Sequence, residues 1–454
     1  MTPERILIVG GGASGVILAA HLLRDSDARL DVSIVERRPT IGAGVAYGTE
    51  ERDHLLNTRA GGMSAFPDDP DHFWRWLTES GHAARLGCAD RFCFVPRPVY
   101  REYLTSLVAP WMDDGRLRVI QGDCVDLVAF KGGVSATLAD GRTEIAGLVV
   151  LATGHAVPEY DDTTPYSGPW CSREELGIGP DDAVVIVGTG LSMVDNVALL
   201  RAGGHRGRIV AVSRRGLLPQ VHAPSEPLKL DPADIPFGTS VTYLLRWLRR
   251  TVRWAEAEGS DWRDVIDALR PHTQALWQSL SVDSKRRFLR HARTFWEVHR
   301  HRLAPQAAAS LQVALSEDHL QILAGRLEEA RRDAGRIAIR IRRRGGDAVA
   351  LDSDRLIDCT GILRDPTDGS GRLVGRMIDR GAARLDPLLV GIDVDKHCAI
   401  VGADGISSPR LYAVGPVTRA RFWEITAIPD IRAQCAALAR TLRDRRETLA
   451  PTSG

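Results

Sequence analysis

The feature that most constrains this chain is an apolar run that breaks into three spaced glycines and continues as an Ala/Leu-rich segment. Residues Ile6 to Val9 are apolar, and Gly10, Gly12 and Gly15 follow with the spacing G-x-G-x-x-G. This pattern predicts a buried strand, a tight turn and a helix. The three glycines permit the turn, the close approach of a pyrophosphate and tight packing of helix on strand, respectively.

A carboxylate supports the interpretation of this segment as a dinucleotide site. The next apolar run, "LDVSIVERR", ends in Glu36, about 20 residues beyond the last glycine, where a carboxylate accepts hydrogen bonds from ribose hydroxyls. The predicted cofactor contacts of this first unit are Gly10, Gly12, Ala13, Ser14, Gly15, Glu36 and Arg37.

The same design recurs in the middle of the chain, in "AVVIVGTGLSMVDNVALL". Gly188 and Gly190 keep the first half of the glycine pattern, but Met193 stands at the third position. The methionine predicts looser helix packing or a shifted approach to the phosphates. The predicted contacts here are Gly188, Gly190, Leu191 and Ser192.

The strand that follows this second turn has a different end. It closes in Ser213, Arg214 and Arg215, where the first unit has Glu36. Arginine pairs with a ribose 2′-phosphate, so NADPH is favoured over NADH. The alternative is that both arginines are a solvated strand end.

Matching segments close both units. Each ends in a strand followed by Thr-Gly, at Thr153-Gly154 and at Thr360-Gly361. The repeat predicts an α/β protein of two interleaved Rossmann-like dinucleotide-binding domains, for FAD and NADP, with a mainly helical insert. The expected domains are residues 1–175 with an insert at 41–116, residues 180–355 with a helical insert at about 228–315, and residues 356–454, which complete the first domain.

Composition excludes several classes of function. The 59 basic and 58 acidic residues leave a formal charge of +1, so no overall field favours nucleic acid or a membrane surface. No run approaches the roughly 20 apolar residues of a membrane helix. The seven scattered cysteines favour free thiols in a reducing compartment, and we expect a cytoplasmic protein.

Longer motifs carry a resemblance to a known family. The chain resembles the two-dinucleotide-binding flavoproteins, and within them the YdhS-like group of bacterial FAD/NAD(P)-binding proteins, over essentially its whole length. The motifs include "HLLNTRAGGMSAFPDDPDHFWRWL", "FVPRPVYREYL", "VSRRGLLPQVH" and "WEITAIPDIRAQ". The resemblance implies FAD in the first unit, NAD(P)H in the second and a relation to flavin-containing monooxygenases, including N-hydroxylating ones. It implies no particular substrate.

The resemblance also assigns further residues to the flavin. A helix beginning near Trp423 and Glu424 would turn its N-terminus toward the flavin pyrimidine edge. Met63 has core packing as an equal alternative. The implied flavin contacts are Asn57, Met63, Ser64, Val125, Ala152, Thr153, Gly154, Gly415 and Trp423.

Three residues are candidates for a catalytic role: Asn57, His222 and His301. Surface or capping roles are the alternative for the two histidines. No metal is expected, because His299 and His301 do not share a helical face and have no partner at ligand spacing.

We hypothesise that NADPH reduces FAD and that the reduced flavin uses O2 to hydroxylate a small N- or S-containing nucleophile. The alternatives are a flavin oxidoreductase without oxygen insertion and a non-catalytic flavin-binding sensor. Ring-expanding oxygenation is disfavoured, because the linker "SGPWCSREELGIGP" lacks its histidine fingerprint. Disulfide reduction is disfavoured because Cys88 and Cys93, although spaced CxxxxC, lie in an insert. The sequence predicts no oligomeric state.

Overall fold

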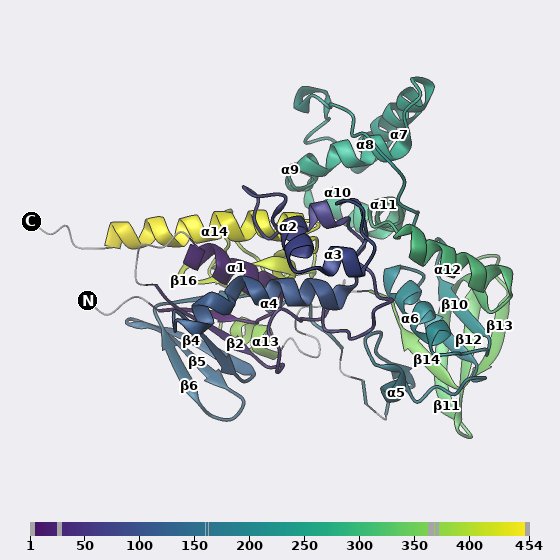
Figure 1. Ribbon diagram of the computed structural model, residues 1–454, viewed down its shortest axis with the longest axis horizontal. Helices are drawn as coiled ribbons and strands as arrows, with labels where there is room; N and C mark the ends of the chain where they lie inside the picture. The colour runs from purple at the N-terminus through teal and green to yellow at the C-terminus, as the bar shows by residue number, and fades with distance from the viewer. Residues whose placement is uncertain are drawn as a thin grey trace, which may run out of the picture. The chain divides into compact units, whose positions relative to one another are not determined.

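The computed structural model describes residues 5–24, 30–158, 160, 161, 163–361, 367 and 372–449. The chain divides into two compact units, each drawn as an α/β structure in Figure 1. Unit 1 comprises Met1–Glu50, Arg59–Val157 and Leu363–Gly454, and unit 2 comprises Glu51–Thr58 and Pro158–Ile362. The predicted fold class is confirmed.

Unit 1 is built on a six-stranded sheet with the order β15-β16-β7-β1-β2-β3. Every neighbouring pair is parallel except β15 and β16. The central strands β1 and β7 are mainly apolar because helices and loops cover both faces of a parallel sheet. The strands are β1 (Arg5–Val9), β2 (Asp31–Glu36), β3 (Leu117–Gln121), β7 (Leu148–Leu151), β15 (Ala399–Val401) and β16 (Ser407–Ala413).

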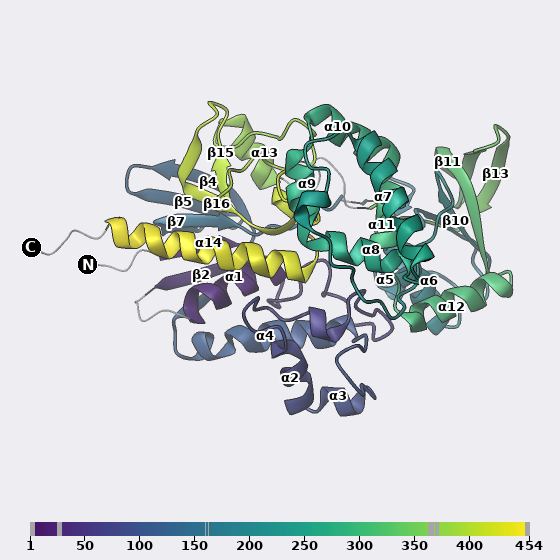
Figure 2. The same ribbon diagram turned by 90° about the horizontal axis from the view of Figure 1, so that it is seen from above.

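Helices cover this sheet, and α1 (Ala13–Arg24) lies at their centre. It packs against α14 (Ile428–Leu449) and against α4 (Arg97–Asp113), which lie beside it in Figures 1 and 2. The predicted aromatic insert contributes η1 (Ala60–Gly62), α2 (His72–Glu79) and α3 (His82–Arg85). Its aromatic side chains form core, since Phe73, Tyr100 and Tyr103 are fully buried.

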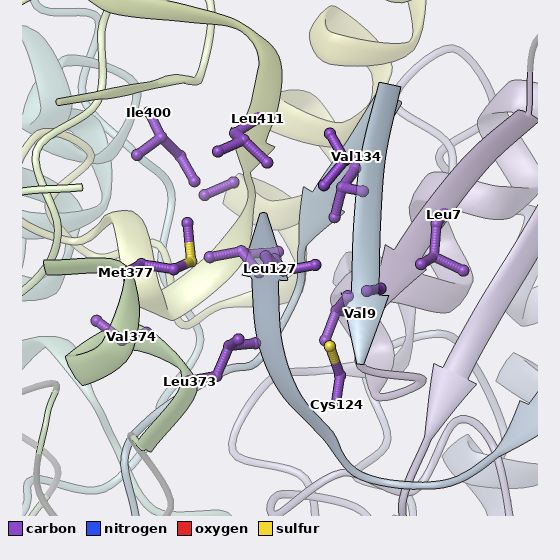
Figure 3. Packing of buried hydrophobic residues seen from close by; sticks show 14 of the residues in the cluster. Leu7, Val9, Cys124, Leu127, Val134, Leu373, Val374, Met377, Ile400 and Leu411 are labelled. Atoms are coloured by element: carbon purple, nitrogen blue, oxygen red, sulfur yellow. The ribbon is translucent and has the colours of Figure 1, made fainter. Parts of the chain in front are cut away.

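A small antiparallel sheet completes unit 1. It consists of β4 (Cys124–Phe130), β5 (Gly133–Leu138) and β6 (Thr143–Ala146), and it packs against α13 (Arg372–Asp379). Figure 3 shows the apolar cluster at this junction, with Leu127 between Val134 and Met377. The C-terminal part of the chain thereby shares a core with the N-terminal part.

Unit 2 repeats the parallel plan in a seven-stranded sheet with the order β13-β12-β11-β10-β9-β14-β8. Its meander is continuous with the parallel strands, because the long strand β11 pairs with β10 at one end and with β12 at the other. Helices α6 (Leu191–Ala202) and α12 (Pro305–Ser316) pack together beside it. The strands are β8 (Tyr166–Ser167), β9 (Val184–Val187), β10 (Ile209–Ser213), β11 (Leu320–Asp333), β12 (Arg336–Arg343), β13 (Ala348–Ser353) and β14 (Arg355–Asp358).

The predicted helical insert lies in unit 2. A buried ion pair anchors it, because Arg302 is 2% exposed and its guanidinium donates to both carboxylate oxygens of Asp267 at 2.8 and 3.0 Å. The insert contains α7 (Val241–Ala257), α8 (Trp262–Leu269), α9 (Thr273–Ser279), α10 (Val282–Arg287), η4 (Phe288–Ala292) and α11 (Arg293–Arg300).

The unit boundaries differ from those expected. Residues 51–58 and 158–175 belong to unit 2. His54 contacts the carbonyl of Asp195 at 3.2 Å, and Tyr166 of β8 pairs with Leu356 of β14. Long-range pairing of this kind leaves no local mark in the sequence.

The expectation that all seven cysteines are free is wrong. Cys88 and Cys93 form a disulfide in the insert of unit 1, with their Cα atoms 5.6 Å apart. The other cysteines are free: Cys171 is partly buried, and Cys124, Cys359, Cys398 and Cys435 are buried.

Candidate functional site

In the turn between β1 and α1, the atoms around each glycine of the first unit explain why glycine stands there. Gly10 has φ +108°, and a Cβ on it would lie 2.5 Å from the carbonyl oxygen of Ala152. A Cβ on Gly15 would lie 2.0 Å from the carbonyl oxygen of Gly10. A Cβ on Gly12 would instead meet the backbone of Gly44 at 3.3 Å. The protein itself therefore requires the first and third glycines, whereas a side chain at the second would need the backbone of Gly44 to shift by only a few tenths of an ångström.

The start of α1 follows this turn and suits an anion. Ala13 begins the helix, and the N–H groups of the first turn have no intrahelical acceptor. The first turn carries no acidic residue that would repel a phosphate. Ser14 is 6% exposed and is part of this turn. The geometry fits the pyrophosphate of a dinucleotide.

Glu36 ends β2 at the same edge and is buried. Its carboxylate accepts hydrogen bonds from the N–H groups of Gly11 at 2.6 Å and Arg38 at 2.8 Å. Each carboxylate oxygen keeps a further lone pair for a ribose hydroxyl. Glu36 thus fixes the turn and still fits its predicted role.

Sequence reasoning named Arg37 and missed Arg38. The side chain of Arg37 is exposed, whereas that of Arg38 is half-buried and donates to the carbonyl of Gly44, opposite Gly12. Burial, followed by repulsion from Arg37, lowers the pKa of Arg38. Two adjacent arginines in the sequence gave no signal as to which one turns inward.

The segment after β7 lies at the same edge of the sheet. The N–H of Ala152 donates to the carbonyl of Val9 at 2.8 Å, so Ala152 continues the pairing of β7 with β1. Thr153 is exposed, and Gly154 has φ +73°, a backbone conformation that favours glycine. These three predicted contacts therefore flank the turn that holds Gly12.

His155 follows directly and was not identified from the sequence. Burial, with a smaller contribution from the charge of Arg419, lowers the pKa of His155 well below its usual range. The imidazole is therefore neutral at neutral pH.

The side chains of Met63 and Ser64 are committed to the core of unit 1. Ser64 is fully buried, and its hydroxyl donates to the carbonyl of Asp69 at 2.6 Å. Met63 is 3% exposed, and its carbonyl accepts a hydrogen bond from Tyr100 at 2.9 Å. A contact of either residue with a flavin would have to use backbone atoms.

Val125 and Gly415 occupy special backbone positions. Val125 lies at an irregularity in the β4–β5 pairing, and its carbonyl accepts from Arg376 at 3.1 Å. Gly415 has φ +74°, and a Cβ on it would lie 2.3 Å from the hydroxyl oxygen of Ser14. The C-terminal segment therefore closes directly onto the start of α1.

The expected start of the C-terminal helix is wrong. Trp423 is 6% exposed, but α14 begins at Ile428. Glu424 has φ +65°, which a helix does not allow, whereas Pro429 suits the first turn of a helix.

The turn between β9 and α6 in unit 2 divides its glycines in the same way. Gly188 has φ +116°, and a Cβ on it would lie 2.1 Å from the carbonyl oxygen of Cys359. A Cβ on Gly190 would meet no described heavy atom within 4 Å. Leu191 and Ser192 form the first turn of α6, which carries no acidic residue. Met193 is fully buried in the core between helix and sheet, so it replaces the third glycine as a packing residue.

The end of β10 holds the residues predicted to select the nicotinamide cofactor. The hydroxyl of Ser213 is hydrogen-bonded to that of Thr189 at 2.8 Å. Arg215 donates to the carbonyl of His291 at 3.1 Å, and its guanidinium lies 4.5 Å from the ring centroid of Phe295. Arg214 is exposed and has no ion pair among the described residues. The helical insert therefore engages Arg215, and Arg214 is the arginine available to a phosphate.

The three catalytic candidates all lie in unit 2. The Nε2 atom of His222 donates to the carbonyl of Asn57 at 3.0 Å, and its backbone N–H donates to Leu303 at 2.9 Å. His301 caps α11, two residues before Leu303. The structure thus joins Asn57 to His222 directly, and His301 stands two residues before Leu303, whose carbonyl accepts from the backbone N–H of His222.

The described part of the chain lacks two features. None of its helices is long and apolar enough to cross a membrane. It holds no cluster of three or more His, Cys, Asp or Glu side chains suited to a metal ion.

Residues 7–156 match the FAD-NAD(P)-binding family. The match covers the β1–α1 turn, Glu36 and the Thr-Gly segment after β7. It confirms the predicted dinucleotide function of this region. The chain is also 28% identical over 206 residues to the uncharacterized protein YdhS of Escherichia coli K12, a stretch that covers 42% of this chain and 38% of that relative.

Solved structures share the whole fold at low sequence identity. The ornithine N-hydroxylase KtzI of Kutzneria sp. 744, with reduced FAD, NADP+ and L-ornithine, is similar with a TM-score of 0.69 at 16% identity, over 98% of this chain and 100% of that one. The cadaverine monooxygenase DfoA of Erwinia amylovora, bound to FAD, has a TM-score of 0.62 at 13% identity, over 98% and 95%. The bacillithiol disulfide reductase Bdr of Bacillus cereus has a TM-score of 0.55 at 14% identity, over 98% and 100%.

The second glycines of the two turns give a paired test of the cofactor sites. We expect Gly12→Ala to fold after a shift of a few tenths of an ångström at Gly44, but to weaken FAD retention at least about tenfold, because the methyl group occupies the place of the pyrophosphate. The matched variant Gly190→Ala should keep FAD and instead bind NADPH more weakly. Flavin content after desalting and NADPH titration distinguish the two, and full FAD retention in Gly12→Ala would place the flavin elsewhere.

The lowered pKa of His155 predicts a pH-dependent stability. The unfolded histidine takes up a proton near pH 6.5, but the folded one stays neutral to much lower pH, so the free energy of unfolding should fall as the pH drops below about 6.5. The slope from this one group is at most about 1.4 kcal/mol per pH unit. His155→Gln should reduce the slope, whereas the exposed-site control His397→Gln should not. Urea unfolding between pH 5 and 7.5 measures this slope. Identical slopes in the wild type and His155→Gln would show that His155 titrates normally.

Proposed function

We propose that this protein is an FAD-dependent, NADPH-using monooxygenase that hydroxylates a small nitrogen- or sulfur-containing nucleophile. The observation that carries the proposal is the pair of strand-turn-helix units in which the second glycine is packed less tightly by the protein than the first. One chain with two dinucleotide sites suits electron transfer from a nicotinamide to a flavin. Structural likeness to N-hydroxylases that act on ornithine and cadaverine supports the choice of monooxygenase.

The residues of unit 1 fit a tightly held flavin. The first turn of α1 supplies N–H donors, and Glu36 supplies acceptors for the ribose. Arg38 braces the loop at Gly44 opposite the pyrophosphate position. When bound, FAD would accept hydride and activate O2. The chain would orient the cofactor and exclude water.

His155 contributes a neutral polar group at this edge. A neutral imidazole donates one hydrogen bond and accepts another without adding charge.

The substrate class we favour is a small primary amine. Hydroxylation at nitrogen requires the free lone pair, so the ammonium ion must lose its proton before it reacts. His222 is held by the carbonyl of Asn57 and by the backbone of Leu303, and a fixed imidazole can accept such a proton. This assignment of His222 is a part of the proposal.

A flavin oxidoreductase without oxygen insertion is the second candidate. Likeness to the bacillithiol disulfide reductase of Bacillus cereus favours it. The ratio of O2 uptake to hydroxylated product separates the monooxygenase from the oxidoreductase. With NADPH and a panel of diamines and basic amino acids, we expect O2 uptake to match hydroxylated product detected by mass spectrometry.

Three results would contradict parts of this proposal. H2O2 equal to all the O2 consumed, with every amine, would rule out oxygenation but leave the oxidoreductase. Purified protein without flavin, which also fails to bind added FAD, would rule out every flavin function. A yellow protein that neither nicotinamide bleaches without air would indicate a sensor.

Arg214 gives a test of the choice between NADPH and NADH. A charge-assisted bond to the 2′-phosphate contributes about 1.5 to 3 kcal/mol, so Arg214→Ala should weaken NADPH at least about tenfold and leave NADH nearly unchanged. The matched variant Arg215→Ala should have a smaller effect, because that guanidinium already contacts Phe295 and His291. The rate of anaerobic flavin reduction, measured against nicotinamide concentration, tests both variants. An unchanged ratio of NADPH to NADH affinity in Arg214→Ala would show that this residue is solvated surface.

A further inference from the structure

The disulfide between Cys88 and Cys93 closes a short loop in unit 1. The loop runs from the end of α3 to the segment before α4, and both cysteines are partly exposed. Ring closure over a sequence separation of 5 residues constrains the backbone of Ala89 to Phe92. Because both cysteines are partly exposed, a reductant in solution can reach the disulfide bond.

The loop is coupled to η1 by backbone hydrogen bonds. The N–H of Ala60 donates to the carbonyl of Cys93 at 2.9 Å, and that of Gly61 donates to Arg91 at 2.8 Å. A Cβ on Gly61 would lie 3.1 Å from the side chain of Arg91, so the contact is close. The disulfide loop thus supports the backbone of η1.

Charged side chains of both signs lie in and beside the loop. Arg91 pairs with the carboxylate of Asp71 at 2.9 Å, and the guanidinium of Arg59 stands 5.3 Å from the ring centroid of Phe92. Disulfide exchange proceeds by attack of a thiolate, so the attacking thiol must reach one of the two sulfurs.

The remaining thiols contrast with this pair. Burial raises the pKa of Cys124 to about 12 and that of Cys398 to about 12. Burial also raises the pKa of Cys171, Cys359 and Cys435. These thiols stay protonated and are poor nucleophiles.

We propose that Cys88 and Cys93 form a reversible redox switch that sets the order of η1. Two equivalents of a small thiol, such as glutathione, break the Cys88–Cys93 bond and form one disulfide between themselves. Their two protons and two electrons pass to the cysteine sulfurs, which become thiols. The opened loop then holds Ala60 and Gly61 less firmly. Met63 and Ser64 follow η1 directly, so the switch acts on a segment predicted to lie beside the flavin.

The test uses the full chain in glutathione buffers of graded redox ratio. N-ethylmaleimide added to the native protein should label Cys88 and Cys93 under reducing conditions and neither under oxidising conditions, with recovery on reoxidation. Hydrogen exchange at the amides of Ala60 and Gly61 should be at least about tenfold faster in the reduced protein, because the covalent constraint is lost. The amide of Gly10, bonded to Val35, serves as the internal reference.

Variants separate the switch from general unfolding. Cys88→Ser/Cys93→Ser should show the fast exchange in both buffers, and the matched control Cys171→Ser should behave as wild type. A disulfide that resists reduced glutathione would overturn the proposal. So would reversible reduction that leaves the Ala60 and Gly61 exchange unchanged. Because neither readout needs oxygenation, failure of the monooxygenase assay would leave the result unaffected.

Discussion

The contact on which both units depend is the approach of one glycine to a carbonyl across the sheet. Gly10 faces the carbonyl of Ala152, and Gly188 faces that of Cys359, at distances that exclude any side chain. In each unit this contact joins the first strand to the strand on the other side of the reversal in strand order, β7 or β14. Ligands bind open α/β sheets at such a reversal, so the packing requirement also forms the site.

Much of this could be predicted from sequence because the determinants are local. Apolar runs, glycine spacing and the carboxylate of Glu36 specify the strand-turn-helix units within a few dozen residues. The contact of Arg215 with Phe295 and the pairing of His222 with Asn57 depend on segments far apart in the chain. No periodicity records such contacts, and the helix start at Ile428 required the backbone angle of Glu424.

The position of Met193 shows where a glycine pattern misleads. The third glycine in unit 1 is needed because a Cβ on Gly15 would collide with Gly10. In unit 2 the equivalent methionine is fully buried and fills the space between α6 and the sheet. The function of the pattern therefore resides in the first two glycines. The first glycine permits the turn, and the second adds no side chain where a ligand would lie. Unit 2 keeps both glycines.

The two units differ in how far their own chain encloses that space, and this difference bears on their roles. In unit 1 the N–H of Gly42 donates to the carbonyl of Gly11 at 2.7 Å, and Gly415 packs onto Ser14, so two further segments surround the turn. In unit 2 the second glycine faces no described atom within 4 Å. An enclosed site slows dissociation of its ligand, whereas an open one allows rapid exchange. Enclosure suits a resident flavin in unit 1, and openness suits a nicotinamide in unit 2 that must leave after each hydride transfer.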